Sequence, residues 1–157
     1  MFTGDGTGGS GDFLMSALQR TGFANIPTSQ RADDGLALRD AYILAAVRCA
    51  PPDNKPHPGE IAACLDHFDA ELAELPNVRV VVALGRIAFE AYLQLLRRRG
   101  IAPSPRPAFA HGGAVDMGPA LPMLIGCYHP SRQNTNTGKL TPAMMQQVFV
   151  QARHLLR

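Results

Sequence analysis

Several hydrogen-bond donors crowd together in residues 129–139, HPSRQNTNTGK. This segment follows residues 122–128, PMLIGCY, whose continuous apolar character is typical of a buried strand. Donors at the end of such a strand suit an anionic ligand or an oxygen atom on which negative charge develops. The same composition also fits a loop with only a structural role. The donors are His129, which could hydrogen-bond to a carbonyl oxygen that gains charge, and Ser131, Arg132 and Gln133, which could contact a nucleic-acid backbone.

Two cysteines form a second candidate group. Cys49 follows a predicted strand, and Cys64 lies in the first half of a predicted helix. His67 stands three residues after Cys64, so these two side chains and Cys49 could bind zinc. The alternative is a pair of buried free thiols, which pack as small apolar side chains.

A third candidate is the glycine-rich segment 2–12, FTGDGTGGSGD. Its glycines could cradle a phosphate through backbone amides, although no Gly-Lys-Ser/Thr follows and it is therefore not a Walker loop. A flexible N-terminal segment is the alternative. Phe2 and Asp5 are the side chains in its first half that could take part in chemistry.

Alternating strands and helices must position these residues. Continuous apolar segments predict buried strands at 41–47, 78–84 and 122–128. Helices are predicted over about 13–21 with Asp12 as cap and Gly22 as stop, over 58–75, over 86–99 with a stripe of Ile87, Ala91 and Leu95, and from Pro142 onward with Thr141 as cap.

This alternation predicts an α/β fold, a three-layer α/β/α sandwich with a parallel sheet, in one domain spanning 1–157. Ligands of such sheets bind beyond the carboxyl ends of the strands. Those ends carry residues 49–57, 85–86 and 129–138, so we expect the functional site there.

The formal net charge of +2 does not by itself indicate a nucleic-acid partner. Three arginines, residues 97–99, end a predicted helix, where they suit the helix dipole and are expected to be solvated. Better candidates for phosphate contact are cations in loops near strand ends, namely Arg48, Lys55, Arg132 and Lys139.

The three cysteines are an odd number, and the N-terminus lacks the basic and apolar stretches of a signal peptide. The longest aliphatic run, 41–47, is too short to span a bilayer. We therefore expect a cytoplasmic protein without a membrane partner, and a monomer.

Three segments occur in a characteristic order: RCAPPDNKP at 48–56, VVALGR at 81–86 and HPSRQNTNTG at 129–138. In these segments the chain resembles the family-5 (type b) uracil-DNA glycosylases, relatives of the family-4 thermostable enzymes, from Phe2 to about His154. The resemblance implies an α/β/α sandwich and a 4Fe–4S cluster bound by four cysteines. It also implies base-excision repair, in which uracil, hypoxanthine or another deaminated base is flipped out of DNA and cleaved at its N-glycosidic bond.

By this resemblance, Cys49 and Cys64 match two of the cluster ligands, whereas Cys127 matches none and is expected to be structural. Phe2 matches the aromatic residue that stacks on the flipped base. Asp5 matches the acidic residue that positions water or stabilises the oxocarbenium-like sugar.

The same resemblance assigns His129 to the histidine that donates to the base carbonyl as the base leaves as an anion. Asn54 lies in the loop that borders the base pocket, and Asn134 has a pocket or DNA role. Ala45 stands where uracil-selective relatives carry Asn, which predicts looser selectivity. Because no lysine is placed to form a Schiff base, we expect a monofunctional glycosylase without strand cleavage.

The sequence also departs from the family. A CxxC pair and a Gly-Leu-Ala-Pro-Gly strand-loop precede the FTGD segment in family members, and neither occurs here. Two cysteines cannot complete a four-thiolate cluster. We expect the first strand of the sheet to be missing, an unpaired sheet edge, and little or no glycosylase activity from the chain as written. The alternatives are a non-catalytic remnant that binds DNA and a small zinc-binding domain using Cys49, Cys64 and His67.

Overall fold

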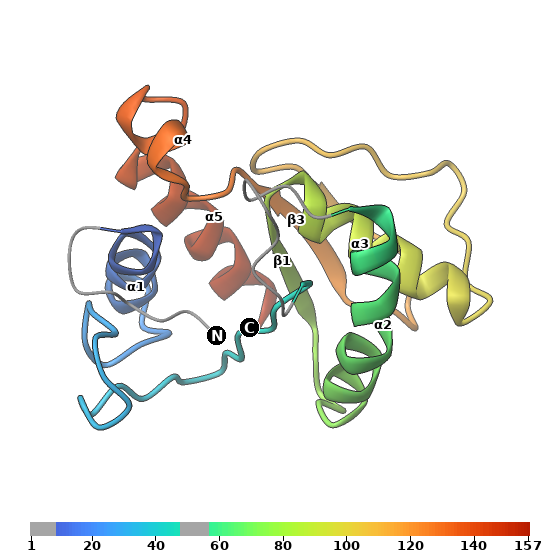
Figure 1. Ribbon diagram of the computed structural model, residues 1–157, viewed down its shortest axis with the longest axis horizontal. Helices are drawn as coiled ribbons and strands as arrows, with labels where there is room; N and C mark the ends of the chain where they lie inside the picture. Colours follow the sequence, from blue (N-terminus) through green and yellow to red (C-terminus); the bar gives the residue numbers. More distant parts are fainter. Residues whose placement is uncertain (1–8, 48–56) are drawn as a thin grey trace.

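A computed structural model describes residues 9–47 and 57–157. Its centre is a three-stranded sheet with helices on both faces (Figure 1). The elements in chain order are α1 (Ser10–Arg20), α2 (Pro58–Ala73), β1 (Val80–Leu84), α3 (Arg86–Arg98), β2 (Ala114–Val115), β3 (Met123–Cys127), α4 (Arg132–Asn136) and α5 (Pro142–Leu155).

The sheet has the order β1-β3-β2. β1 and β3 are parallel, with Val80 opposite Met123 and Leu84 opposite Cys127, as the sequence predicts. β2 is antiparallel to β3, so the prediction of a wholly parallel sheet is wrong there. β2 is only two residues long and lies in a segment expected to be loop, and such a short strand has no hydrophobic pattern to reveal it.

The side chains of β1 and β3 alternate between two apolar cores, because successive residues of a strand point to opposite faces. Ala83 and Leu124 pack with α2 and α3, whereas Ile125 and Cys127 pack with α1 and α5. The two helical layers lie on opposite sides of the sheet in Figure 1. The α/β fold with both sheet faces covered is therefore confirmed.

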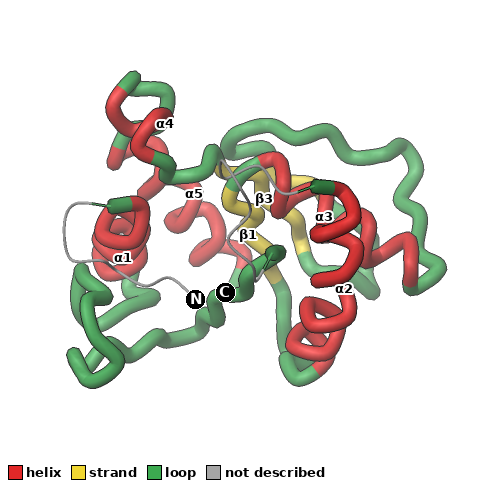
Figure 2. The backbone as a smooth tube through the Cα atoms, in the orientation of Figure 1, coloured by secondary structure: helices red, strands yellow, loops and turns green. Residues whose placement is uncertain are grey.

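The prediction of a strand at 41–47 is wrong. This segment ends a long loop after α1, and in the described part of the chain it forms no ladder with another strand (Figure 2). Its side chains nevertheless alternate as in a strand: Ala41 and Ile43 contact the α1/α5 core, and Leu44 and Ala46 contact the α2/α3 core. A strand needs a neighbour, and β1 pairs only with β3 among the strands described.

Helix ends follow the sequence with one exception. Gly22, with φ of 78°, closes α1 in a Schellman motif, in which Phe23 N donates to Leu18 O at 2.8 Å. Asp12 does not cap α1: it lies in the first turn, and the N-cap is Gly9. Thr141 caps α5 by accepting from Met144 N at 3.2 Å.

His57 caps α2, where its Nδ1 accepts from Gly59 N at 3.2 Å and Glu60 completes a capping box by accepting from His57 N. The stripe predicted on α3 is only partly correct, because Ile87 is 44% exposed whereas Phe89 and Tyr92 are buried.

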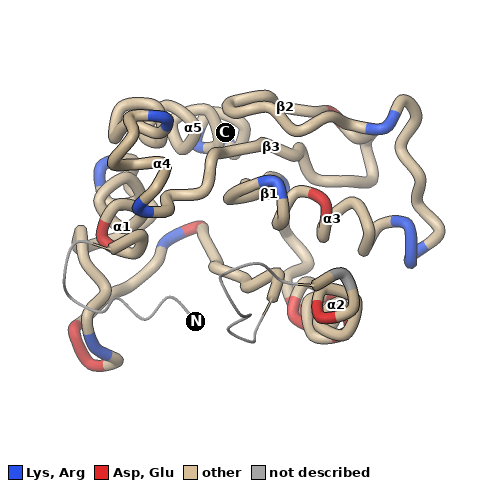
Figure 3. Tube along the Cα trace, turned by 45° about the horizontal axis from the view of Figure 1, so that its top comes forward, with Lys and Arg blue, Asp and Glu red and all other residues tan. Residues whose placement is uncertain are grey.

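Basic and acidic residues are spread over several elements (Figure 3).

Two of the three arginines at the end of α3, which were expected only to be solvated, form ion pairs. Arg98 pairs with Asp66 and Arg99 pairs with Asp69, so both tie α3 to α2. A similar contact joins α5 to the segment that follows α1. Arg153 lies over the ring of Phe23 and pairs with Asp40 at 2.8 Å.

Candidate active-site rim

The carboxyl ends of β1 and β3 meet at one edge of the sheet. We call this edge, which carries Gly85 and His129, the rim. Gly85 directly follows β1, and its N–H donates to the carbonyl of Cys127, the last residue of β3, at 2.7 Å. A Cβ built on Gly85 would lie 3.0 Å from the Cβ of His129. The parallel pair therefore brings His129 against the start of α3, as the carboxyl-end rule predicts.

The backbone of Gly85 requires glycine. Its φ of 95° and ψ of 162° fall in a region that only glycine occupies without strain. Its carbonyl accepts from Phe89 N, and this is the first hydrogen bond of α3. The sharp turn from β1 into α3 therefore depends on the same residue that leaves room for His129.

His129 is open to solvent on one side, while protein atoms packed around the rest of its ring lower its pKa by desolvation. The imidazole is therefore neutral at pH 7 and keeps one N–H as a donor. Its backbone carbonyl accepts from Asn134 Nδ2 at 2.8 Å. The structure thus brings together two of the residues predicted for the site.

The segment after His129 is not a plain loop, because it contains α4. Ser131 is the N-cap of this helix, and its hydroxyl accepts from Asn134 N at 3.3 Å. Arg132 and Gln133 follow in the first turn and are exposed. Ser131 therefore holds the helix that presents the two side chains predicted to contact DNA.

Sequence reasoning missed a cluster of aromatic and cationic side chains at the same edge. The rings of His111 and Tyr128 stack with centroids 4.8 Å apart, and Tyr128 N donates to His111 Nδ1 at 3.0 Å. Lys139 Nζ lies 5.0 Å from the centre of the Tyr128 ring. The signal in the sequence was the His-Gly-Gly triplet at 111–113, within a stretch interpreted only as loop.

The other predicted site residues lie away from the rim or outside the residues that the structure describes. Ala45 lies in the half-buried segment 41–47 between the two cores. The remaining predictions fall outside the described residues, and they concern Phe2, Asp5, Cys49 and Asn54 together with the cations Arg48 and Lys55.

Cys64 and Cys127 lie where the sequence predicts them, but the described residues form no metal site. Cys64 is buried on α2, in the helix where it was predicted, and His67 is exposed one turn later. Cys127 is buried in β3, and burial raises the pKa of its thiol to about 12, which suits a structural residue. Across 9–47 and 57–157, no three His, Cys, Asp or Glu side chains are placed to hold a metal ion. These donors do not by themselves fit an iron–sulfur cluster or a zinc site.

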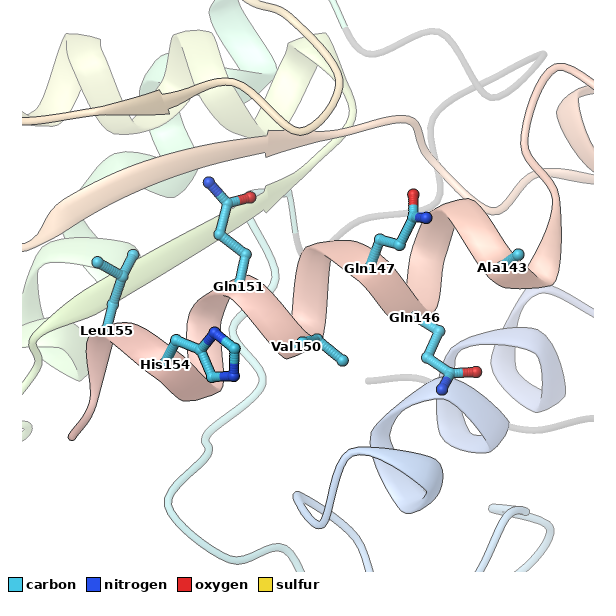
Figure 4. Close-up of a pocket in the computed structure, with 7 residues that line it drawn as sticks. All are labelled: Ala143, Gln146, Gln147, Val150, Gln151, His154 and Leu155. Carbon is cyan, nitrogen blue, oxygen red and sulfur yellow. The ribbon is translucent and has the colours of Figure 1, made fainter.

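A shallow hollow of about 530 Å³ lies along α5 (Figure 4). All the residues that line it belong to this one helix, so it is an open helix face and not a cleft that could enclose a base. They are Ala143, Gln146, Gln147, Val150, Gln151, His154 and Leu155. None of them belongs to the rim.

The fold and rim agree with the comparisons. The family model of the Uracil DNA glycosylase superfamily matches residues 1–153, and the chain belongs to this superfamily. Within it, the chain is similar to type-5 uracil-DNA glycosylases. The protein of Thermus thermophilus is 47% identical over 154 residues, which cover 98% of this chain and 66% of that protein.

Two other type-5 relatives give the same picture. The Mycobacterium tuberculosis protein is 44% identical over 99% of this chain and 56% of its own length. The Pyrobaculum aerophilum protein is 40% identical over 97% and 62%. The chain therefore spans between about half and two thirds of the length of these relatives. In the part of the chain that the structure describes, no helix has the length and apolar character needed to cross a bilayer.

Proposed function

We propose that this chain carries one side of the active site of a DNA repair glycosylase that hydrolyses the N-glycosidic bond of uracil, hypoxanthine and other deaminated bases in DNA. The observation that carries the proposal is the place of His129, a neutral imidazole held against Gly85 at the carboxyl edge of the parallel strand pair. This is where an α/β sheet of this kind binds its ligand.

His129 acts by stabilising charge. When the bond between C1′ and the base breaks, the electron pair leaves with the base, and charge develops on a ring carbonyl oxygen. A neutral imidazole N–H near that oxygen stabilises the anion without donating its proton outright. Water adds to C1′, a proton returns to the base, and an abasic site remains. We assign Asp5 to the attacking water, Phe2 to stacking on the base, and Asn54 to the pocket wall.

DNA contacts are proposed for the exposed start of α4. Arg132 and Gln133 lie beside the rim and can reach phosphate oxygens, and Lys139 adds a third contact. Ala45 has no side-chain amide that could hydrogen-bond to the edge of the base. Its presence therefore supports acceptance of more than one deaminated base. The proposed partner is damaged DNA, and the protein is proposed to act as a cytoplasmic monomer.

The open edge of β1 is proposed to receive one more strand from the additional length that the relatives have. Two observations support it. In the described part of the chain, β1 has a strand on one side only and carries the half-buried Val80 to Val82, and 41–47 displays strand-like alternation toward the same two cores. A strand added beside β1 would pair its second side. For this reason, little or no activity is expected of the 157 residues alone.

Cys64 and Cys49 are proposed as two ligands of a 4Fe–4S cluster whose other ligands come from outside this chain. The support is the buried position of Cys64 at the middle of α2. No step of base release proposed here depends on the cluster.

The deciding experiment is a cleavage assay on uracil-containing and hypoxanthine-containing DNA. It compares residues 1–157 with a chimera that adds the part of the Thermus thermophilus relative that this chain does not cover. Base release by the chimera with abasic-site product supports the proposal. DNA binding without base release in both proteins indicates a non-catalytic remnant, and bound zinc without iron or sulfide indicates a zinc domain.

A further inference from the structure

The turn that carries His111 is fixed tightly on β3. Gly112 N donates to Gly126 O at 2.8 Å, and Gly126 N donates to Gly113 O at 3.1 Å. Gly126 has no room for a side chain, because a Cβ there would collide with the carbonyl oxygen of Ala110. This pairing sets the position of His111 relative to the end of β3.

His111 in turn contacts the peptide next to His129. Its Nδ1 accepts from the backbone N–H of Tyr128 at 3.0 Å, and its ring stacks on the Tyr128 ring with an interplanar angle of 14°. Tyr128 is the residue immediately before His129.

We propose that His111 is a positioning residue for His129: its neutral imidazole accepts from the Tyr128 peptide, stacks on the Tyr128 ring and thereby fixes where the His129 side chain meets the base. The inference rests on the proposed function of His129. It assigns to the 109–113 turn a role that is separate from contact with DNA.

The contact requires one protonation state. Nδ1 accepts a hydrogen bond only when it carries no proton, so the ring donates from Nε2. Desolvation lowers the pKa of His111 and outweighs the opposite effect of the Met144 backbone. The charged groups that face this cluster are Lys139, over the Tyr128 ring, and Arg86, over Phe109, and the titratable His129 directly follows Tyr128.

Two variants of the full 157-residue chain separate the acceptor from the aromatic ring. His111→Phe keeps a ring that can stack on Tyr128 but removes the acceptor. His111→Asn loses the ring but places its Oδ1 near the position of Nδ1, so it can accept from Tyr128 N. Hydrogen exchange of the Tyr128 amide and the pKa of His129 are measured by NMR for both variants and the parent chain.

We expect His111→Phe to speed exchange of the Tyr128 amide at least tenfold and to move the pKa of His129 toward its ordinary value. His111→Asn should stay within about threefold of the parent chain. If the Tyr128 amide exchanges equally slowly in His111→Phe, or if the Asn variant behaves like the Phe variant, the positioning role is wrong. A loss of dispersed NMR signals in His111→Phe is resolved by His111→Gln, which lacks an acceptor at the Nδ1 position and must then reproduce the faster exchange.

These readouts do not need base release. In the active chimera described above, the positioning role further predicts a lower kcat for His111→Phe with little change in KM. If the parent chimera releases no base while the NMR results hold, the glycosylase proposal fails, and the contact between His111 and the Tyr128 backbone stands.

Discussion

The side-chain amide of Asn134 donates a 2.8 Å hydrogen bond to the backbone carbonyl of His129. The two residues are five positions apart, and the short helix α4 folds one back onto the other. The bond closes the segment that follows β3, so the direction of His129 depends on a residue that is itself anchored by the Ser131 cap.

Replacing this donor should weaken base release more than folding. Asn134→Asp keeps the shape but sets a carboxylate against a carbonyl oxygen, which removes about 1 kcal/mol of hydrogen bonding. We expect roughly a fivefold lower kcat in the active chimera. Asn136→Asp, an exposed position at the end of α4, is the matched control. Equal effects of the two substitutions would contradict a role for Asn134 in holding His129.

Gly85→Ala tests the close approach at the rim. The substitution forces an L side chain into a backbone region that costs about 1–3 kcal/mol, and it presses on the Cβ of His129. Urea unfolding should show this loss, and the NMR signals of the His129 ring should shift.

The control for Gly85→Ala is Gly100→Ala. Gly100 also has a positive φ, of 77°, but no atom lies within 4 Å of a Cβ built there. Its stability should fall by about 1–2 kcal/mol while the His129 signals stay in place. Unchanged His129 signals in both variants would show that the contact at Gly85 does not control the histidine.

DNA binding should depend on position and not on the number of cations. Arg132→Ala removes an exposed guanidinium beside the rim, and we expect the salt dependence of the binding constant to fall by about 1 in slope. Arg97→Ala removes an equally charged group at the end of α3. Fluorescence anisotropy with duplex DNA at several salt concentrations measures both. The proposed interface is wrong if Arg97→Ala has the larger effect.

The thiol of Cys127 should be unreactive in the folded protein. Burial raises its pKa to about 12 from 9.0, so the protonated form persists at pH 8, and a protonated thiol is a poor nucleophile. Since the raised pKa favours the protonated native state, this contribution to stability is complete below about pH 9 and is lost as the pH rises toward 12.

Titration with a disulfide reagent at pH 8 measures this. The parent chain and Cys127→Ala should give the same number of reactive thiols when folded, and numbers that differ by one in guanidinium chloride. A difference in the folded proteins would mean that Cys127 is accessible as a thiolate.

The sequence predicted the elements whose pattern is local. Continuous apolar runs marked β1 and β3, and the parallel pairing of these strands then placed His129 and Gly85 at one edge. The segment 41–47 has an equally apolar run, yet its state depends on a neighbouring strand, which no local pattern can report. Its strand-like alternation was correct, whereas its hydrogen bonding was not.

The role of His111 could not be predicted for a related reason. Its position follows from the close packing of Ala110 on Gly126, two residues that are far apart in the sequence. A glycine in a strand indicates that some backbone approaches closely, but it does not say which one. For His67 and Cys64 the local pattern was correct, because both lie on α2 at the predicted spacing. The described donors nevertheless form no metal site.

As far as the described strands show, one side of β1 is unpaired and leaves backbone hydrogen-bonding groups available. Such an edge lowers its free energy either by accepting a foreign strand or by joining its counterpart on another copy. Self-association through this edge rises with the concentration of the chain itself, whereas binding of a foreign strand rises with the concentration of that strand.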